Sequence, residues 1–235
     1  MARKNKNNDK LLTVQRRLVA HNSPKSPSAE QYRTIRTNIQ FSTLEEDIQT
    51  IVMTSSGPGE GKSTTSANLA IVYAQQGKKV LLVDSDLRKP TVHYSFRLEN
   101  YVGFTNVLTK QETLLNAVKK TDVPDLFVLT SGPIPPNPSE LLASGYMNEV
   151  LEQMKAEFDF IIFDTPPTLA VTDSQILSNK ADGTILVVSS GKTNMDAAKK
   201  AKGLLSNSKG RLLGVILNNR KMDNNSQYYY YYGTN

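Results

Sequence analysis

A glycine-rich segment at residues 56–64 constrains this chain more than any other feature. It reads Ser-Gly-Pro-Gly-Glu-Gly-Lys-Ser-Thr and follows an apolar run at 50–55. The pattern G-x-x-x-x-G-K-[ST] describes loops that surround phosphate groups, and only Ser56 departs from it. Glycines let the backbone approach phosphate oxygens, and the helix that follows adds its positive N-terminal end. We therefore expect a nucleoside triphosphate, ATP with Mg²⁺, to bind here.

The residue types in this loop indicate which part of the nucleotide each residue contacts. Lys62 is expected to reach the β- and γ-phosphates, and the Ser63 hydroxyl is expected to ligate Mg²⁺. Arg88, further along the chain, touches phosphate or a neighbouring subunit in this reading. The full set of predicted nucleotide-binding residues is Gly57, Gly59, Glu60, Gly61, Lys62, Ser63, Thr64 and Arg88.

Short apolar runs alternate with helical patterns along most of the chain. Continuous apolar runs of this kind are typical of parallel strands buried on both faces. Strands that alternate with helices predict an α/β fold, a mostly parallel sheet with helices on both faces. The expected strands are 50–55, 79–84, 126–130, 160–164, 184–190 and 212–217, and the expected helices include one from about 62 to 75, one at 138–156 and one at 193–206.

Three carboxylates follow two of these strands. Asp84 is the last residue of the strand at 79–84, and Asp86 lies two residues beyond it. Asp164 is the last residue of the strand at 160–164. Ligands in open α/β sheets bind beyond the carboxyl ends of the strands. Asp164 is expected to hold Mg²⁺ directly or through water, Asp84 and Asp86 to hold the metal's water shell, and one of these two to accept a proton from an attacking hydroxyl. The alternative is that each carboxylate caps the next helix.

Composition excludes several kinds of protein. The chain has 235 residues, 38% hydrophobic and 21% charged, as in an ordinary globular domain. It has no cysteine, which removes disulfides and thiol chemistry and favours a cytoplasmic location. No run approaches the roughly 18 apolar residues that span a bilayer. The N-terminus lacks the apolar run of a secretory signal.

The positive charge is concentrated in two places. The net charge is +6, and residues 1–25 carry seven basic side chains against Asp9 alone. We interpret residues 1–26 as a flexible basic arm, which either binds an anionic surface or is simply solvated. A second basic cluster runs from Lys192 to Lys221, with Asp196 as its only acid. No aromatic-plus-basic pattern for stacking bases occurs, so no nucleic-acid partner is expected.

Several motifs together resemble one family, the bacterial tyrosine kinases (BY-kinases) of the capsule and exopolysaccharide type, often called CpsD/CapB-like. The segments SSGPGEGKST, LLVDSDLRKP and FIIFDTPP look like its Walker A, A′ and B motifs. GPIPPNPSELL at 132–142 resembles a further signature whose chemistry the sequence does not explain. Glu30, Arg33 and Arg36 match an E-x-x-R-x-x-R oligomerisation motif on a helix expected at 28–43, for which Ser28 is the expected cap.

The resemblance implies a P-loop NTPase fold of the MinD/ParA-like branch and a protein-tyrosine kinase domain over residues 27–222. Lys62, Asp84, Asp86 and Asp164 become the expected catalytic residues. Residues 223–235 are expected to form a disordered tail whose tyrosines are autophosphorylated in trans, within a homo-oligomer that is expected to be a ring. The phosphoacceptors are Tyr228, Tyr229, Tyr230, Tyr231 and Tyr232. The alternative is that the tyrosine run only packs against other surfaces, or that it is an accident of composition.

The resemblance also implies a cellular setting. Such kinases act with a separate transmembrane activator, on protein substrates of polysaccharide synthesis, at the inner face of the cell membrane. One alternative function is a P-loop ATPase switch of the MinD/ParA type without kinase activity. Those ATPases carry an extra lysine at the position of Gly57, and its absence argues against them. A non-catalytic, nucleotide-binding regulatory subunit is the other alternative.

Overall fold

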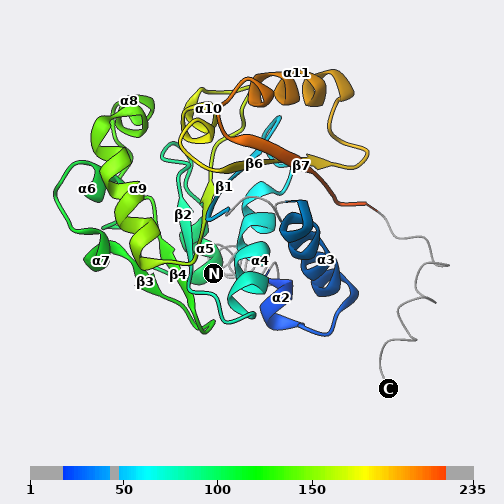
Figure 1. Cartoon of the computed structure of the whole chain (residues 1–235), viewed down its shortest axis with the longest axis horizontal. Coiled ribbons are helices and arrows are strands. Elements are labelled where there is room, and N and C mark those ends of the chain that lie inside the picture. Colours follow the sequence, from blue (N-terminus) through cyan, green and yellow to red (C-terminus); the bar gives the residue numbers. More distant parts are fainter. Residues whose placement is uncertain (1–17, 43–47, 221–235) are drawn as a thin grey trace, which may run out of the picture.

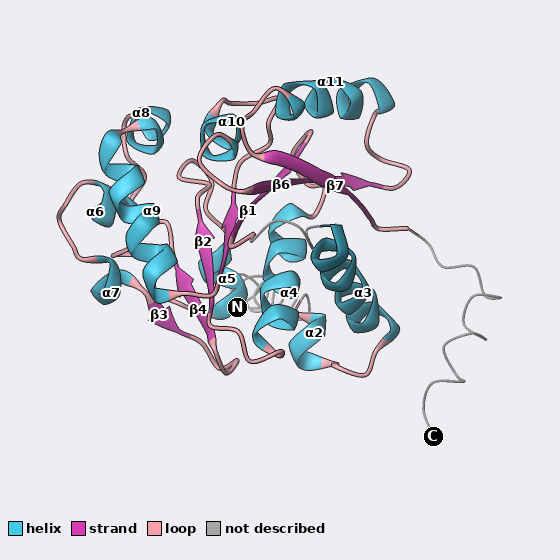
Figure 2. Ribbon diagram, viewed as in Figure 1, coloured by secondary structure: helices cyan, strands magenta, loops and turns pink. Residues whose placement is uncertain are grey.

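The computed structural model describes residues 18–42 and 48–220, which build one seven-stranded sheet with helices on both faces (Figures 1 and 2). The strand order is β3-β4-β2-β5-β1-β6-β7, and every neighbouring pair is parallel except β3 with β4. The predicted mostly parallel sheet is therefore confirmed. The strands are β1 Thr50–Ser55, β2 Val80–Asp84, β3 Lys119–Lys120, β4 Leu126–Leu129, β5 Phe160–Asp164, β6 Gly183–Ser189 and β7 Arg211–Asn218.

Alternation along the central strands divides the core into two layers. In β5, Phe160 and Ile162 join the apolar cluster on one face, whereas Ile161 and Phe163 join the cluster on the other. Successive side chains of a strand point to opposite faces, so a strand covered on both sides must be apolar throughout. This explains why β1, β2 and β5 are buried along their whole length.

Different helices cover the two faces of the sheet (Figure 1). The cluster beneath α2, α3, α4 and α5 contains Ile39, Leu69 and the stacked rings of Tyr73 and Phe160. The opposite cluster lies beneath α6, α7, α8, α9 and α10, and α11 packs on β6 separately through Ala201 and Leu205. The helices are α2 Val19–Asn22, α3 Pro27–Ser42, α4 Lys62–Ala74, α5 Val92–Phe96, α6 Phe104–Leu108, α7 Leu114–Ala117, α8 Pro138–Ala143, α9 Gly145–Glu157, α10 Asp173–Ser178 and α11 Met195–Ser206.

Local capping sets several of these helix boundaries and corrects two expectations. The Ser26 hydroxyl accepts a hydrogen bond from the Ala29 N–H at 3.3 Å, so Ser26 rather than Ser28 caps the start of α3. The single helix expected at 138–156 is two helices, because Ser144 ends α8 and caps α9 by accepting from the Met147 N–H. Within 18–42 and 48–220, no helix combines the length and the apolar character needed to cross a membrane.

Part of the segment interpreted as a flexible arm is packed on the domain. Leu18 and Ala20 are buried in the core, and Ala20 N–H donates to the Asn68 side chain on α4 at 2.9 Å. Because Leu18 and Ala20 supply apolar surface and Asn68 supplies an acceptor, residues 18–22 behave as part of the domain. The flexible-arm interpretation is wrong for these residues, and residues 1–17 lie outside the described part of the chain.

The three charged residues of the expected oligomerisation motif have partners within their own chain. Glu30 and Arg33 form an exposed ion pair one turn apart on α3, and Arg33 also donates to the Pro24 carbonyl oxygen at 2.9 Å. Arg36 donates to the Val72 carbonyl oxygen at 2.7 Å and so ties α3 to the end of α4. Arg36 therefore has a packing role in the single chain, whereas Glu30 and Arg33 remain on the surface.

Arg36→Ala is expected to lower the free energy of unfolding by about 1–2 kcal/mol, because a carbonyl at a helix end loses a charge-assisted hydrogen bond. Arg33→Ala, which removes only exposed contacts, is the matched control and is expected to change it by less than about 0.5 kcal/mol. Urea unfolding of both variants measures this. Equal effects would show that Arg36 does not hold α3 on the domain.

Candidate active site

The phosphate loop joins β1 to α4 through backbone conformations that favour glycine. Gly59 and Gly61 have φ angles of 73° and 90°, in the left-handed region that costs other residues about 1–2 kcal/mol. A Cβ on Gly61 would also lie 2.0 Å from Asn218 Nδ2, whose amide donates to the Glu60 carbonyl oxygen at 2.9 Å. The loop is therefore held closely against the end of β7.

Ser56, the one departure from the glycine pattern, takes part in a buried clamp. Its N–H and hydroxyl both donate to the Glu60 carboxylate at 2.9–3.0 Å, and Thr193 donates to the same carboxylate at 2.8 Å. The Glu60 side chain, expected at the nucleotide, is thus occupied in holding the loop. Sequence reasoning missed this clamp, although serine at position 56 with a glutamate four residues later was the available signal.

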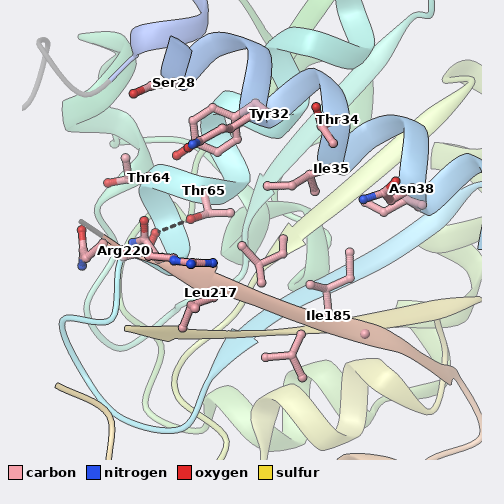
Figure 3. A pocket seen from close by; sticks show the side chains of 18 of the residues that line it. Ser28, Tyr32, Thr34, Ile35, Asn38, Thr64, Thr65, Ile185, Leu217 and Arg220 are labelled. Carbon is pink, nitrogen blue, oxygen red and sulfur yellow. Dashed lines mark hydrogen bonds between the residues drawn. The ribbon is translucent and has the colours of Figure 1, made fainter. Parts of the chain in front are cut away.

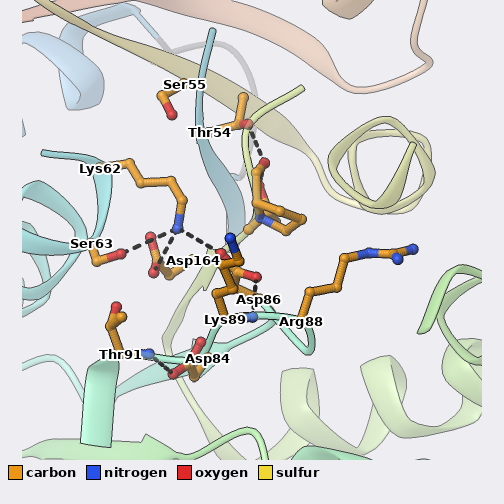
Figure 4. A network of polar contacts seen from close by, with 12 residues as sticks. Thr54, Ser55, Lys62, Ser63, Asp84, Asp86, Arg88, Lys89, Thr91 and Asp164 are labelled. Carbon is orange, nitrogen blue, oxygen red and sulfur yellow. Dashed lines mark hydrogen bonds and ion pairs between the residues drawn. The ribbon is translucent and has the colours of Figure 1, made fainter. Parts of the chain in front are cut away.

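Lys62 is the centre of the site (Figure 4). Its ammonium nitrogen lies 3.3 Å from Asp164 Oδ2, 3.4 Å from Asp86 Oδ2 and 3.2 Å from the Ser63 hydroxyl. Burial opposes the charge of Lys62, but the carboxylates of Asp164, Asp86 and Asp84 outweigh burial and raise the lysine's pKa. The structure therefore brings together residues from α4, from the end of β5 and from the loop after β2, as the sequence predicted.

Asp84 and Asp164 stand side by side at the ends of β2 and β5, where they are paired in register. Asp84 is fully buried, and its Oδ2 accepts from the Thr91 and Val92 N–H groups at 3.0 and 2.9 Å. The helix-cap alternative thus holds for this oxygen. Oδ1 has no hydrogen-bond partner within the described residues. Burial, together with the neighbouring Asp164 charge, raises the pKa of Asp84 to about 7.

Asp86 differs from the other two acids because it reaches the surface of the site. It is 7% exposed, whereas Asp84 and Asp164 are 0% exposed. Its Oδ1 accepts from the Lys89 N–H at 3.0 Å, which fixes the turn, and its Oδ2 faces Lys62. Of the three carboxylates, Asp86 is therefore the only one with exposed atoms.

The acids do not form a closed metal cage. Across residues 18–42 and 48–220, no group of three His, Asp or Glu side chains is arranged to hold an ion unaided. Mg²⁺ commonly takes one or two carboxylates and completes its six ligands with water and substrate phosphates. The predicted ligand set of Ser63, Asp84, Asp86 and Asp164 fits that incomplete kind of site. The unpartnered Asp84 Oδ1, next to Asp164, is an oxygen that such a shell of water could satisfy.

Arg88 points away from the phosphate loop (Figure 4). It makes a two-pronged contact with the buried Asp173 carboxylate at 2.9 and 3.1 Å, and it donates to the Ser139 hydroxyl at 2.9 Å. Ser139 belongs to the segment 132–142, whose role the sequence did not explain. Arg88 therefore connects that segment to the loop bearing Asp86, and its side chain is not directed at phosphate in this structure.

A hollow of about 1210 Å³ opens on the outer side of the phosphate loop (Figure 3). It is lined by Gly59, Gly61 and Thr64 of the loop region, by the inner face of α3, and by β7 with the residues that follow it to Arg220. Lys62 and the three acids are not part of this lining. The hollow is thus a space beside the phosphate loop.

The predicted acceptor tyrosines, Tyr228–Tyr232, lie outside the described part of the chain. Their contacts with the site therefore stay a prediction. The described chain ends at Arg220, which borders the hollow beside the phosphate loop.

Comparison with known proteins agrees with this geometry. A parallel α/β sheet with a phosphate loop and acids at the adjoining strand ends defines a P-loop NTPase, and the family model of the AAA domain matches residues 48–202. The tyrosine-protein kinase YwqD of Bacillus subtilis is 56% identical over 89% of this chain and 88% of its own length. The tyrosine-protein kinase CpsD of Streptococcus agalactiae is 43% identical over 80% of this chain and 81% of its own. The chain belongs to the bacterial tyrosine-protein kinase family.

Solved structures separate this family from its nearest alternative. The crystal structure of the chimerical protein CapA2B2 superposes with a TM-score of 0.85 at 45% identity, over 88% of this chain and 91% of that one. The cell division ATPase MinD of Pyrococcus furiosus superposes with a TM-score of only 0.62 at 26% identity, over 72% of this chain and 71% of that one. The shared fold is confirmed, and the MinD-type alternative is not favoured.

Gly61→Ala is expected to weaken nucleotide binding about tenfold or more. The left-handed backbone costs alanine about 1–2 kcal/mol, the added carbon collides with Asn218, and 1.4 kcal/mol is tenfold in affinity. Gly203→Ala on α11, where an added Cβ meets nothing within 4 Å, is the control and is expected to bind normally. Titration with a fluorescent ATP analogue measures both. Unchanged affinity in Gly61→Ala would contradict the role of the loop.

Asp84 is expected to make the nucleotide-free protein less stable as pH rises. A carboxyl with a folded-state pKa near 7 binds its proton more tightly in the folded than in the unfolded state. Its contribution is therefore lost as pH climbs from about 4 through 7, by at most about 1.4 kcal/mol per pH unit. Asp84→Asn mimics the neutral acid and should flatten this slope. Urea unfolding in EDTA between pH 5 and 8 tests it, and identical slopes in both proteins would refute it.

Proposed function

We propose that this chain transfers the γ-phosphoryl group of ATP to tyrosines of its own C-terminal segment, acting between copies of the chain. The observation that carries the proposal is the buried Lys62 ammonium, which lies between Asp86 and Asp164 beside the phosphate loop. A positive group at this position can stabilise charge on the transferring phosphoryl oxygens. The run of five tyrosines supplies an acceptor other than water.

The chain's own residues divide the work. Backbone N–H groups of the loop and Lys62 hold the triphosphate, and Ser63 with the acids would hold Mg²⁺, which supplies further charge neutralisation. The tyrosine oxygen bonds to the γ-phosphorus as the bond from that phosphorus to the β,γ-bridging oxygen breaks, and ADP leaves with the electron pair. The phenolic proton passes to Asp86, chosen because it alone of the three carboxylates is exposed at all, and then to water.

The setting of this reaction rests on family resemblance. We infer a homo-oligomer, with a ring as its expected form, in which the segment 223–235 of one copy enters the site of the next. A separate transmembrane activator is the expected partner, and proteins of capsular or exopolysaccharide synthesis are the expected further substrates. These partners would place the chain on the cytoplasmic side of the cell membrane. Autophosphorylation with and without the activator's cytoplasmic tail tests the first of these partners.

Lys62→Met protein is expected to gain no phosphotyrosine on incubation with Mg·ATP, because the triphosphate loses its buried cation. Lys120→Met, an exposed lysine of β3, is the control and should be modified like the parent. An immunoblot for phosphotyrosine compares them. Undiminished phosphotyrosine in Lys62→Met would overturn the proposed catalytic role.

Mixing two variants, neither of which can be modified alone, distinguishes phosphoryl transfer between chains from phosphoryl transfer within one chain. A chain with phenylalanine at Tyr228–Tyr232 keeps the site but lacks the acceptor, whereas the Lys62→Met chain keeps the acceptor but lacks the site. Neither is expected to be modified alone, and the Lys62→Met chain is expected to be modified in the mixture. An unmodified mixture would show that transfer occurs only within a chain.

A further inference from the structure

The exposed surface of α11 carries three lysines that the proposed catalytic site does not use, of which Lys199 and Lys202 are one turn apart and Lys200 lies on the adjacent side of the helix. Lys199, Lys200 and Lys202 are exposed, whereas Ala201 and Leu205 face the sheet and are buried. No ion pair involves these three lysines among the residues that the structure describes, and Asp196 is the only acid in the helix. The face is a solvent-facing positive surface without a matching negative partner on the described domain.

The chain leaves the domain at the edge strand β7, whose end is hydrogen-bonded to the segment that leads into α11. The Ser190 N–H, on the segment leading to α11, donates to the Asn218 carbonyl oxygen at 2.8 Å, and Asn219 donates to the Ser189 hydroxyl at 3.0 Å. The ends of β6 and β7 are therefore joined just before α11, whereas Arg220 borders the hollow on the α3 face of the sheet. Because α11 packs on the opposite face through Ala201 and Leu205, a segment that follows Arg220 must pass the edge of β7 to reach α11.

The remaining length is sufficient to follow the helix. Tyr228 lies eight residue steps beyond Arg220, an extended reach of about 26–29 Å at 3.3–3.6 Å per residue. The 12 residues of α11 span only about 18 Å at 1.5 Å per residue. The segment that leads to the tyrosine run can thus extend further than the whole length of α11.

Phosphorylation changes the charge of this segment far more than that of any other part of the chain. Residues 221–235 contain one lysine and one aspartate, so their side chains are neutral together before modification. Each phosphotyrosine adds about −1.5 to −2 charge and three acceptor oxygens at pH 7. We propose that the phosphorylated C-terminal segment docks on Lys199, Lys200 and Lys202 of its own chain. The inference rests on the proposed tyrosine autophosphorylation.

The construction of α11 favours this occupant over an anionic membrane. A helix that lies in a membrane surface inserts an apolar face below its charged one. In α11 the apolar face is already buried against β6 through Ala201 and Leu205, which leaves only charges to contact lipid. Docking would also withdraw a modified segment from the acceptor position of a neighbouring site. The lysines of α11 thereby bind the phosphorylated C-terminal segment, which is the product of the reaction.

The absence of cysteine from the chain allows a direct distance measurement. Ser206→Cys on α11 and Asn235→Cys at the C-terminus carry two spin labels, and the full-length protein is measured before and after phosphorylation by Mg·ATP. The spin–spin distance distribution is expected to shorten and narrow after phosphorylation. The shift should persist when labelled chains are diluted in unlabelled ones, because the contact is within one chain.

The lysines are tested by a matched pair of variants. In Lys199→Gln/Lys200→Gln/Lys202→Gln the shift should disappear, and a phosphatase should remove phosphate from the segment several-fold faster. Lys25→Gln/Lys110→Gln/Lys120→Gln removes three exposed lysines from other elements and should behave like the parent. Raising the salt concentration should weaken the contact, since exposed charges are screened over about 8 Å at physiological ionic strength.

Each outcome has a separate meaning. A chain that gains no phosphotyrosine overturns the proposed function and the docking together. A phosphorylated chain whose distances are unchanged overturns the docking alone, as does a shift that is lost on dilution. Binding of the phosphorylated chain to phosphatidylserine vesicles through the three lysines, with the segment still free, would also overturn it.

Discussion

The contact between the Lys62 ammonium and the carboxylates of Asp86 and Asp164 is the constraint on which the rest of the structure depends. Three charges in a buried place are costly to desolvate, by several kcal/mol per ion, and they are tolerated only where each has an opposite partner. Burial and the neighbouring Asp164 raise the pKa of Asp84 to about 7, because a further negative charge there would add to this cost. A buried group of charges of this kind adds little to the stability of the fold. It is explained better as a binding site, in which phosphate would interact with the lysine and a metal ion with the carboxylates.

The site is supported by parts of the chain that are distant in sequence. Glu60 fixes the phosphate loop through Ser56 and reaches Thr193, which precedes α11. Arg88 fixes the loop that bears Asp86 by binding Asp173. Each supporting carboxylate, Glu60 or Asp173, is almost fully buried and satisfied by hydrogen bonds, so it positions backbone rather than reacting. The loop geometry therefore depends on the second half of the chain as much as on the glycines.

Much of this arrangement could be predicted from the sequence, because strand ends in a parallel sheet share one edge. That rule was sufficient to bring Lys62, Asp86 and Asp164 together. It could not predict the directions of side chains that have more than one possible partner. Arg88 was expected at phosphate, but a buried carboxylate 85 residues away offers it a two-pronged contact. Residues 18–22 are interpreted from the sequence as part of a flexible arm because residues 1–26 are polar overall, and this hides the apolar Leu18, Val19 and Ala20. Only tertiary contacts reveal that Leu18 and Ala20 are buried.

The central claim is that the phosphoryl group goes to tyrosine rather than to water. The most direct test measures, in one reaction, the ADP formed and the phosphate found by mass spectrometry on the C-terminal peptide containing Tyr228–Tyr232. The account predicts that phosphate on these tyrosines rises in step with ADP until the acceptors are filled, and that ADP formation then slows. Continuous release of inorganic phosphate from ATP, with an unmodified peptide, would contradict it and would indicate a simple ATPase.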